Sequence, residues 1–404
     1  MSTTDRQLRV GMVGYAFMGA AHSQAWRTVN RVYDLPARVR MALVCGRDAG
    51  KVADAADRLG WEAHTTDWRD LIARDDIDVV DVCTPGDSHA EIALAALAAG
   101  KHVLCEKPLA NTVAEARAMA AAAATAQAAG VRSMCGFNYR RVPAVAMMRQ
   151  LIADGRIGVI RHVRAAYLQD WIVDPQFPLV WRLQRDRAGS GALGDIGAHI
   201  IDLTQYVTGR RITGVSAVTE TFVKERPLPG GSSGLAATVD GDGHHRATGT
   251  VTVDDAAVFV ARLDGGVLAT YEASRFATGR KNALRVEING SLGTVAFDLE
   301  RLNELEFYDA TRPAAEQGFS RILVTEGEHP YMSAWWPPGH LIGYEHSFTH
   351  QARDFVEAVA TGVDPAPSFA DGLQVQLVLD AVTRSAELGS SWTEVEPALA
   401  AVAV

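Results

Sequence analysis

Three residues far apart in the chain have side chains that could move a proton: Lys107, Asp195 and His199. Lys107 follows an apolar segment in the run Glu106-Lys107-Pro108, whereas Asp195 and His199 stand four residues apart, a spacing that shares one helix face. A neutral imidazole can take a hydroxyl proton, and a lysine whose pKa is depressed by a nearby positive charge can hydrogen-bond the same oxygen. We interpret His199 as a general base, Lys107 as a partner of the reacting oxygen and Asp195 as a group that orients the substrate or the imidazole. A solvated lysine and a helix N-cap are the simpler interpretations of Lys107 and Asp195.

A turn near the N-terminus has the pattern of a nucleotide site. It follows an apolar strand at residues 8–13, opens a helix at about residues 19–29, and fits G-x-G-x-x-G except that alanine replaces the middle glycine. The start of such a helix offers unpaired N–H groups and the positive end of a dipole to an anion. A purely structural glycine turn is the alternative. The cofactor-binding residues predicted here are Gly14, Tyr15, Ala16, Phe17, Met18 and Gly19.

The end of the second predicted strand, at residues 41–45, bears on the choice of cofactor. An enzyme that uses NAD usually has a carboxylate there for the ribose 2′-hydroxyl, but this chain has Gly46 followed by Arg47. A glycine leaves room and an arginine matches a 2′-phosphate. The sequence therefore predicts NAD(P) and favours NADP, with Gly46 and Arg47 in contact with it. Asp48 at the strand end would favour NAD, and an adenine stacked on Arg47 would suit either cofactor.

The order of predicted elements defines the fold class. Apolar strands alternate with helical segments up to about residue 137, which predicts an α/β domain with a parallel sheet of the Rossmann type. Longer alternating strands follow, with hairpin turns at Asp264-Gly265-Gly266 and Asn289-Gly290, and they predict an α+β domain with a large, mostly antiparallel open sheet. The predicted division is 1–137 for dinucleotide binding and 138–404 for substrate binding and oligomerisation, with closing helices that could pack back on the first domain. We also expect a helix at residues 142–154, a strand at 247–253, an exposed loop at 229–245, and helices at 344–361 and 370–387.

Composition excludes several classes of protein. Hydrophobic residues make up 48% and charged residues 22%, and the net charge of −9 argues against a nucleic-acid partner. The polar N-terminus and the lack of a long apolar run predict a cytoplasmic protein without a membrane partner. The four cysteines are widely spaced in apolar segments, so we expect buried reduced thiols and no metal site.

Aromatic and polar residues gather in sequence around the segment of Asp195 and His199. Aromatic faces beside hydrogen-bonding groups suit a polyhydroxylated ligand, because its C–H faces and its hydroxyls need different partners. Core packing is the alternative for the tryptophans. The predicted substrate-binding residues, besides Asp195 and His199, are Tyr139, Tyr167, Gln169, Trp171, Trp181 and Arg182.

Taken together, these motifs resemble the Gfo/Idh/MocA oxidoreductases. The resemblance spans essentially the whole chain, and the segments after Phe137, Tyr167, Pro178 and Pro367 are most similar to the levoglucosan dehydrogenase and C-glycoside 3-oxidoreductase branch. The motifs that carry it are Gly14-x-Ala16-x-x-Gly19, Thr84-Pro85 with His89, Glu106-Lys107-Pro108 and Gly194-Asp195-x-x-x-His199.

The resemblance implies a dehydrogenase for a sugar, anhydrosugar, glycoside or cyclitol. Hydride would move between a secondary hydroxyl carbon, such as C3, and the nicotinamide, with Lys107, Asp195 and His199 around the reacting carbon. It also implies a homodimer or homotetramer. Two alternatives remain open: redox-neutral glycosidase or lyase chemistry with a retained cofactor, and a non-catalytic cofactor-binding regulator. The cofactor contacts it implies beyond the glycine turn are Thr84, Pro85, His89, Glu106, Lys107 and Asn138.

Overall fold

The computed structural model describes residues 6–229 and 247–397, and the chain divides into two compact units. Unit 1 is made from residues 1–143 and 325–373, and unit 2 from residues 144–324 and 374–404. The chain therefore passes into unit 2 after residue 143 and later returns to unit 1 for a stretch of about fifty residues.

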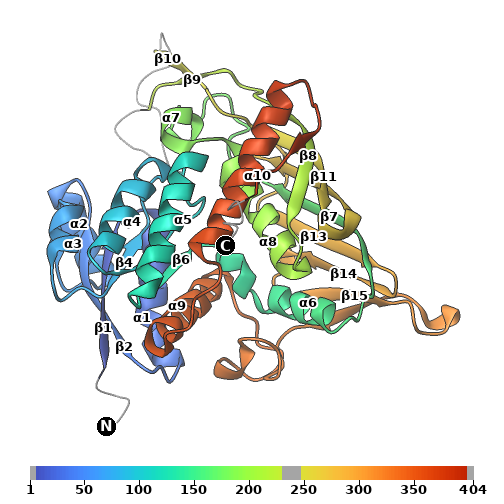
Figure 1. Ribbon diagram of the computed structural model, residues 1–404, viewed down its shortest axis with the longest axis horizontal. Helices are drawn as coiled ribbons and strands as arrows, with labels where there is room; N and C mark the ends of the chain where they lie inside the picture. The colour runs from blue at the N-terminus through green and yellow to red at the C-terminus, as the bar shows by residue number, and fades with distance from the viewer. Residues whose placement is uncertain (1–5, 230–246, 398–404) are drawn as a thin grey trace, which may run out of the picture. The chain divides into compact units, whose positions relative to one another are not determined.

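Unit 1 is built around a six-stranded parallel sheet with the order β3-β2-β1-β4-β5-β6. This is the order of a dinucleotide-binding Rossmann sheet, and it confirms the predicted parallel α/β fold. The strands are β1 (Gln7–Val13), β2 (Arg38–Cys45), β3 (His64–Thr65), β4 (Val79–Val82), β5 (His102–Cys105) and β6 (Ser133–Cys135). The helices are α1 (Phe17–Val32), α2 (Ala49–Leu59), α3 (Trp68–Ala73), α4 (His89–Ala98), α5 (Val113–Ala128) and α9 (Tyr344–Thr361). Helix α4 lies beside α5, and α1 beside α9 (Figure 1).

Local sequence accounts for the limits of these elements. All four residues of Val79–Val82 are buried, as expected for a strand with both faces covered. The Asp48 side chain caps the start of α2, and Gly60 ends that helix in the left-handed region at φ 83°. Helix α1 begins at Phe17 and not near Gly19 as expected, because the carbonyl of the residue before Phe17 already accepts the first helical hydrogen bond.

Unit 2 contains a nine-stranded sheet with the order β16-β15-β14-β13-β7-β12-β11-β8-β17, in which only β7 and β12 pair in parallel. The prediction of a large, mostly antiparallel sheet is confirmed. The strands are β7 (Ile160–Leu168), β8 (Ile212–Glu220), β11 (Ala256–Leu263), β12 (Val267–Ser274), β13 (Ala283–Gly290), β14 (Gly293–Asp298), β15 (Glu304–Asp309), β16 (Phe319–Leu323) and β17 (Thr393–Glu394). The helices are α6 (Pro143–Ala153), α7 (Arg185–Ala188), α8 (Ala198–Thr208) and α10 (Phe369–Glu387), and α6 and α10 begin in unit 1.

Helix α8 packs on β7 and β13, which places the segment of Asp195 and His199 against the sheet (Figure 1). The strands alternate as a half-covered sheet requires. Along Val267–Ser274, buried and exposed residues take turns up to the last two positions. Val258, Val260 and Leu268 point outward from β11 and β12 and are exposed.

Some expectations for unit 2 were wrong in detail. The strand expected at residues 247–253 shortens to β10 (Thr248–Thr250), which pairs only with β9 (Glu225–Pro227) and not with the large sheet. The turn expected at Asn289-Gly290 lies two residues later, at Ser291 and Leu292, because β13 runs through Gly290 before β14 begins at Gly293. The loop expected at 229–245 lies outside the described residues, apart from residue 229. Within the described ranges, no helix has the length and apolar composition to cross a membrane.

Candidate active site

The turn between β1 and α1 has the backbone geometry of a dinucleotide-binding loop. Gly14 has φ +100°, and a side-chain carbon there would lie 2.6 Å from the carbonyl oxygen of Cys83, which directly follows the neighbouring strand β4. A carbon on Gly19 would lie 2.2 Å from the Gly14 oxygen. Ala16 has φ −72°, a conformation open to any residue, so alanine is accommodated at the middle position without strain.

The first turn of α1 has neither a side-chain cap nor an acidic residue. Helix α2 is capped by Asp48, α3 by Asp67, and α5 by Thr112 in a capping box with Glu115. A helix start without a side-chain partner, at the carboxyl edge of a parallel sheet, leaves its N–H groups and its dipole to an anion. The residues of this turn therefore fit the pyrophosphate of a dinucleotide.

The carboxyl end of β2 brings Gly46 against Tyr15 of the glycine turn. A side-chain carbon on Gly46 would lie 1.9 Å from the Tyr15 ring, so the ring occupies the place that a side chain at this strand end would take. Partial burial raises the pKa of Tyr15, and Asp48 raises it further while Arg47 lowers it, so all three side chains share one region. The Asp48 carboxylate accepts the N–H of Lys51 at 3.0 Å.

Two neighbouring loops of the sheet edge are joined by His89. Its Nε2 lies 2.9 Å from the Thr84 carbonyl oxygen and its Nδ1 lies 3.0 Å from that of Pro108. The imidazole is 1% exposed, and the Thr84 hydroxyl accepts a hydrogen bond from Ser88 at 2.8 Å. His89 thus holds together the loop after β4 and the turn after β5, both of which the resemblance assigns to the nicotinamide.

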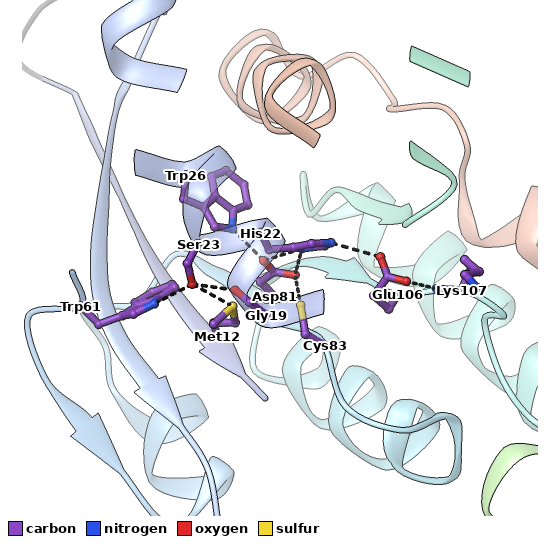
Figure 2. A network of polar contacts seen from close by, with 10 residues as sticks. All are labelled: Met12, Gly19, His22, Ser23, Trp26, Trp61, Asp81, Cys83, Glu106 and Lys107. Atoms are coloured by element: carbon purple, nitrogen blue, oxygen red, sulfur yellow. Dashed lines mark hydrogen bonds and ion pairs between the residues drawn. The ribbon is translucent and has the colours of Figure 1, made fainter. Parts of the chain in front are cut away.

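Lys107 lies in the turn directly after β5, beside the buried carboxylate of Glu106. The Glu106 Oε2 accepts the backbone N–H of Lys107 at 3.2 Å, and the Glu106 Oε1 lies 3.1 Å from Nε2 of His22 (Figure 2). Of the other predicted contacts in unit 1, Asn138 is buried and donates to the Ser347 hydroxyl at 2.8 Å.

His22, Asp81 and Cys83 lie close enough together to share a metal ion. However, Nδ1 of His22 lies 2.9 Å from the Asp81 carboxylate, whereas two ligands of a tetrahedral zinc ion at about 2.0–2.1 Å are farther apart than this. Trp26 donates to the same carboxylate at 2.7 Å. Direct hydrogen bonds therefore account for this cluster.

In unit 2, Asp195 lies in a π-helical segment, Leu193–Gly197, that runs directly into α8 and His199. Single π turns inside helices are rare and are frequent at functional sites. The Asp254 carboxylate fixes the start of this segment by accepting the N–H groups of Gly191 at 2.7 Å and Leu193 at 2.8 Å.

A buried arginine supports Asp195. Arg275 is 0% exposed, and its Nη1 lies 3.6 Å from Oδ2 of Asp195. Burial lowers the pKa of Arg182, and the Asp195 charge opposes that effect, so a second guanidinium lies within reach of the same carboxylate. The Asp195 carboxyl group therefore has two cationic neighbours, which is more than an N-cap requires.

His199 is 7% exposed and lies edge-on to the Tyr167 ring, with ring centres 5.8 Å apart. The Tyr167 hydroxyl donates to Oδ1 of Asn282 at 2.7 Å, and Gln169 Nε2 donates to the same oxygen at 2.8 Å. Trp171 donates to Oε1 of Gln169 at 3.0 Å. The aromatic and amide groups beside His199 thus form one hydrogen-bonded set.

The predicted residues fall into two groups. Asp195, His199, Tyr167, Gln169, Trp171 and Arg182 form one cluster in unit 2, and Trp181 adjoins it through the Arg182 guanidinium, 4.3 Å from its ring centre. Lys107 belongs to unit 1, so its convergence with Asp195 and His199 stays a prediction. Tyr139 also belongs to unit 1, where it packs edge-on to Tyr344.

Sequence reasoning missed several residues of these clusters. Asp254, Arg275 and Asn282 belong to no motif of the sequence, and nothing in their neighbourhood marks them as partners of the Asp195 segment or of Tyr167. His22 carried a usable signal, because it is a polar residue four positions before Trp26 on the buried face of α1.

The chain belongs to the Gfo/Idh/MocA oxidoreductase family. Residues 8–133 match the oxidoreductase family with an NAD-binding Rossmann fold, and residues 145–296 match the GFO/IDH/MocA C-terminal domain. The sequence is 43% identical to levoglucosan dehydrogenase of Pseudarthrobacter phenanthrenivorans over 96% of this chain and 98% of that protein.

Two solved oxidoreductase structures are similar to this chain over nearly its whole length. An oxidoreductase domain protein from Kribbella flavida is 63% identical with a TM-score of 0.92, over 97% of this chain and all of that chain. A levoglucosan dehydrogenase solved with NADH and levoglucosan is 41% identical with a TM-score of 0.89, over 97% of this chain and 100% of that chain.

Proposed function

We propose that the chain is an NAD(P)-dependent dehydrogenase that oxidises a secondary hydroxyl group of a sugar, anhydrosugar, glycoside or cyclitol, at C3 of a pyranose ring. The observation that carries the proposal is the pair of Asp195 and His199 at the junction of a π turn and α8, beside the polar set of Tyr167 and Gln169. The uncapped start of α1 in the Rossmann unit supports the binding of a dinucleotide cofactor.

The proposed chemistry assigns one task to each side chain. His199 takes the hydroxyl proton while the hydride leaves the carbon, so the alcohol becomes a ketone. Lys107 hydrogen-bonds the reacting oxygen and stabilises the developing alkoxide. Asp195, held by Arg275, orients the substrate through a second hydroxyl. A bound nicotinamide supplies the acceptor for the hydride.

Support for a sugar-like substrate comes from the neighbours of His199. The oxygens and N–H groups of Gln169, Asn282 and Tyr167 can exchange partners with ring hydroxyls, and the Trp171 face suits ring C–H groups. A solved relative that covers 97% of this chain carries the name levoglucosan dehydrogenase and was solved with NADH and levoglucosan. These facts favour an anhydrosugar or glycoside over other alcohols.

The cofactor side leaves a choice between two dinucleotides. Gly46 and Arg47 at the end of β2 favour NADP, and the Asp48 carboxylate is occupied by capping α2. The relative solved with NADH favours NAD. Initial rates with NAD and NADP over the same concentration range measure the preference, and a 2′-phosphate bound by Arg47 gives the higher kcat/KM with NADP.

We also propose a homodimer or homotetramer that forms through the open face of the unit 2 sheet. That face carries exposed Val258, Val260 and Leu268 beside a groove of about 500 Å³ lined by both acidic and basic side chains. A mixed apolar and charged surface suits contact with a second copy. Light scattering after size exclusion measures the assembly, and a monomer at micromolar concentration contradicts it.

The first experiment is a panel of sugars, anhydrosugars and cyclitols with each cofactor, followed by the absorbance of reduced nicotinamide. Reduction of NAD or NADP with one of these substrates supports the proposal. Consumption of a glycoside without net cofactor reduction, by protein that retains its cofactor after purification, indicates redox-neutral glycosidase or lyase chemistry. Cofactor binding without any turnover indicates a regulator.

The residue assignment has its own test. Lys107→Ala and His199→Ala should each lower kcat by at least about 100-fold, because each removes a proton-transfer or oxyanion partner. Lys224→Ala and His340→Ala, at exposed positions, serve as matched controls with unchanged kcat. Turnover within threefold of the wild type in either site variant rejects that residue's role.

A further inference from the structure

A buried polar network in unit 1 joins the first helix of the cofactor site to the turn that carries Lys107. His22 of α1 lies between two carboxylates: its Nδ1 is 2.9 Å from Oδ2 of Asp81 on β4, and its Nε2 is 3.1 Å from Oε1 of Glu106 after β5 (Figure 2). The exposed fractions of the three residues are 2%, 0% and 4%. The three groups come from elements that are up to 84 residues apart in sequence.

The geometry fixes the protonation of the network. Both ring nitrogens of His22 face carboxylate oxygens, which only accept, so both nitrogens donate and the ring is an imidazolium. Burial alone would lower the pKa of His22, but the charge and hydrogen bond of Asp81, together with Cys83, raise it well above its usual value. Asp81 is further satisfied by donors from Trp26 at 2.7 Å and Cys83 at 3.5 Å.

The Glu106 carboxylate connects His22 to the backbone of Lys107. One oxygen faces His22, and the other accepts the Lys107 N–H at 3.2 Å. The space around this carboxylate is set by Gly136, where a side-chain carbon would lie 2.7 Å from Oε1 of Glu106. His22 and Gly136 therefore both lie against the carboxylate that accepts the Lys107 N–H.

We propose that His22 is a positioning residue, which bridges Asp81 and Glu106 and so fixes the Lys107 turn relative to helix α1. At one end of the network, His22 lies on α1, which starts at the turn assigned to the cofactor. At the other end, Glu106 accepts the N–H of Lys107, the proposed partner of the reacting oxygen. His22 therefore fixes the position of the Lys107 backbone relative to helix α1 through the Glu106 carboxylate. This inference rests on the proposed dehydrogenase function for its effect on turnover.

Two amide variants separate the halves of the bridge. In His22→Asn the side-chain amide nitrogen takes the place of Nδ1, so the contact with Asp81 is kept and that with Glu106 is lost. In His22→Gln the amide nitrogen takes the place of Nε2, so the contact with Glu106 is kept. The expected result is a kcat about 10–100-fold lower in H22N, because a misplacement of about 1 Å costs about that much, and within about threefold of wild type in H22Q.

A merely structural role predicts the opposite order. Asp81 is the more deeply buried carboxylate and accepts three donors, so a variant that keeps its contact should be the more stable and the more active one. Thermal melting of both variants measures that stability beside kcat and KM. Activity that follows melting temperature, with H22N above H22Q, overturns the proposal.

Two measurements need no substrate. Hydrogen–deuterium exchange on the peptide that contains Lys107 should be faster in H22N than in H22Q, and equal exchange overturns the proposal. The nitrogen-15 spectrum of histidine-labelled wild type at pH 8 should show His22 protonated on both nitrogens, assigned by its loss in H22N, and a neutral ring contradicts the bridge. A wild type without activity on any substrate rejects the proposed function, while these two results still decide the role of His22.

Discussion

Replacing Asp81 by asparagine should be far more damaging than replacing a carboxylate that makes equally short bonds at the surface. Asp81→Asn keeps the side-chain shape but removes the charge that faces the His22 imidazolium, and it offers one acceptor oxygen to the donors of Trp26, Cys83 and His22. Breaking one side of a buried ion pair costs about 3–5 kcal/mol, because the remaining charge stays buried. We expect D81N to lower the free energy of unfolding by that amount.

The matched control is Asp76→Asn. The Asp76 carboxylate accepts two hydrogen bonds from Arg74, at 2.8 and 2.7 Å, but its side chain is 46% exposed. Water replaces the lost partner there, so the expected cost is below about 1 kcal/mol. The contrast between the two variants isolates burial, because charge removal and bond lengths are alike.

Urea unfolding of the full chain, followed through exchange protection of α1 and β4, measures both variants in unit 1. The free energy of unfolding falls by about 1–3 kcal/mol per molar urea. The urea midpoint of D81N should therefore fall by about 1–2 M or more, and that of D76N by much less. A D81N midpoint within the error of the wild type, or equal losses in both variants, refutes the reasoning from burial.

The ion pair of His22 and Asp81 also predicts how stability depends on pH. The folded-state pKa of His22 is raised, so the stabilisation from its charge is fully present below the unfolded value of about 6.5 and is lost progressively as the pH rises through the folded-state value. In D81N the imidazolium has lost its stronger partner and this slope should be smaller. The unfolding free energies of wild type and D81N should therefore approach each other above neutral pH.

Two further predictions concern other buried contacts. Asp254→Ala leaves the N–H groups of Gly191 and Leu193 without their acceptor and should cost about 2–4 kcal/mol in urea unfolding, with faster exchange across residues 189–197. Asp174→Ala removes a side-chain acceptor from one exposed N–H group, that of Gln176, and should cost less than about 1 kcal/mol. His350 is held neutral, because burial lowers its pKa to about 3, so its contribution to stability is present above pH 6.5 and is lost as the pH falls toward 3; His350→Asn should flatten the fall in melting temperature between pH 6.5 and 4.5, and an unchanged slope contradicts this.

The Rossmann fold of unit 1 could be predicted from sequence because its determinants are local. The turn from Gly14 to Gly19 lies within one strand–turn–helix, and the apolar strands and capping residues set the rest of the sheet. Helix α9 also has the limits expected from its apolar pattern. What sequence could not give is its membership of unit 1, because residues 325–373 return to that unit after about 180 residues of another fold. No local pattern encodes such a return.

The polar partners of the site could not be predicted for a related reason. Arg275 reaches Asp195 from eighty residues away, and Asn282, just before β13, bonds to Tyr167 on the neighbouring strand β7. These residues are polar side chains at the ends of strands, a position where most polar residues simply meet solvent. Only the register of β7, β12 and β13 decides which of them face the same cluster.

Substitutions in the glycine turn and substitutions among the buried charged residues should affect the proposed enzyme differently. The cofactor turn is built from backbone conformation and from glycines whose missing side chains leave room, so substitutions there act by obstruction. Lys107 and Asp195 are instead held by buried charges, His22 with Glu106 in unit 1 and Arg275 in unit 2, so substitutions there act by leaving a charge unpaired. A buried unpaired charge costs several kcal/mol, whereas the misplacement needed to slow a reaction tenfold corresponds to about 1.4 kcal/mol. Variants such as H22Q, which keep the contact nearest the reacting residue, are therefore the ones that can separate positioning from folding.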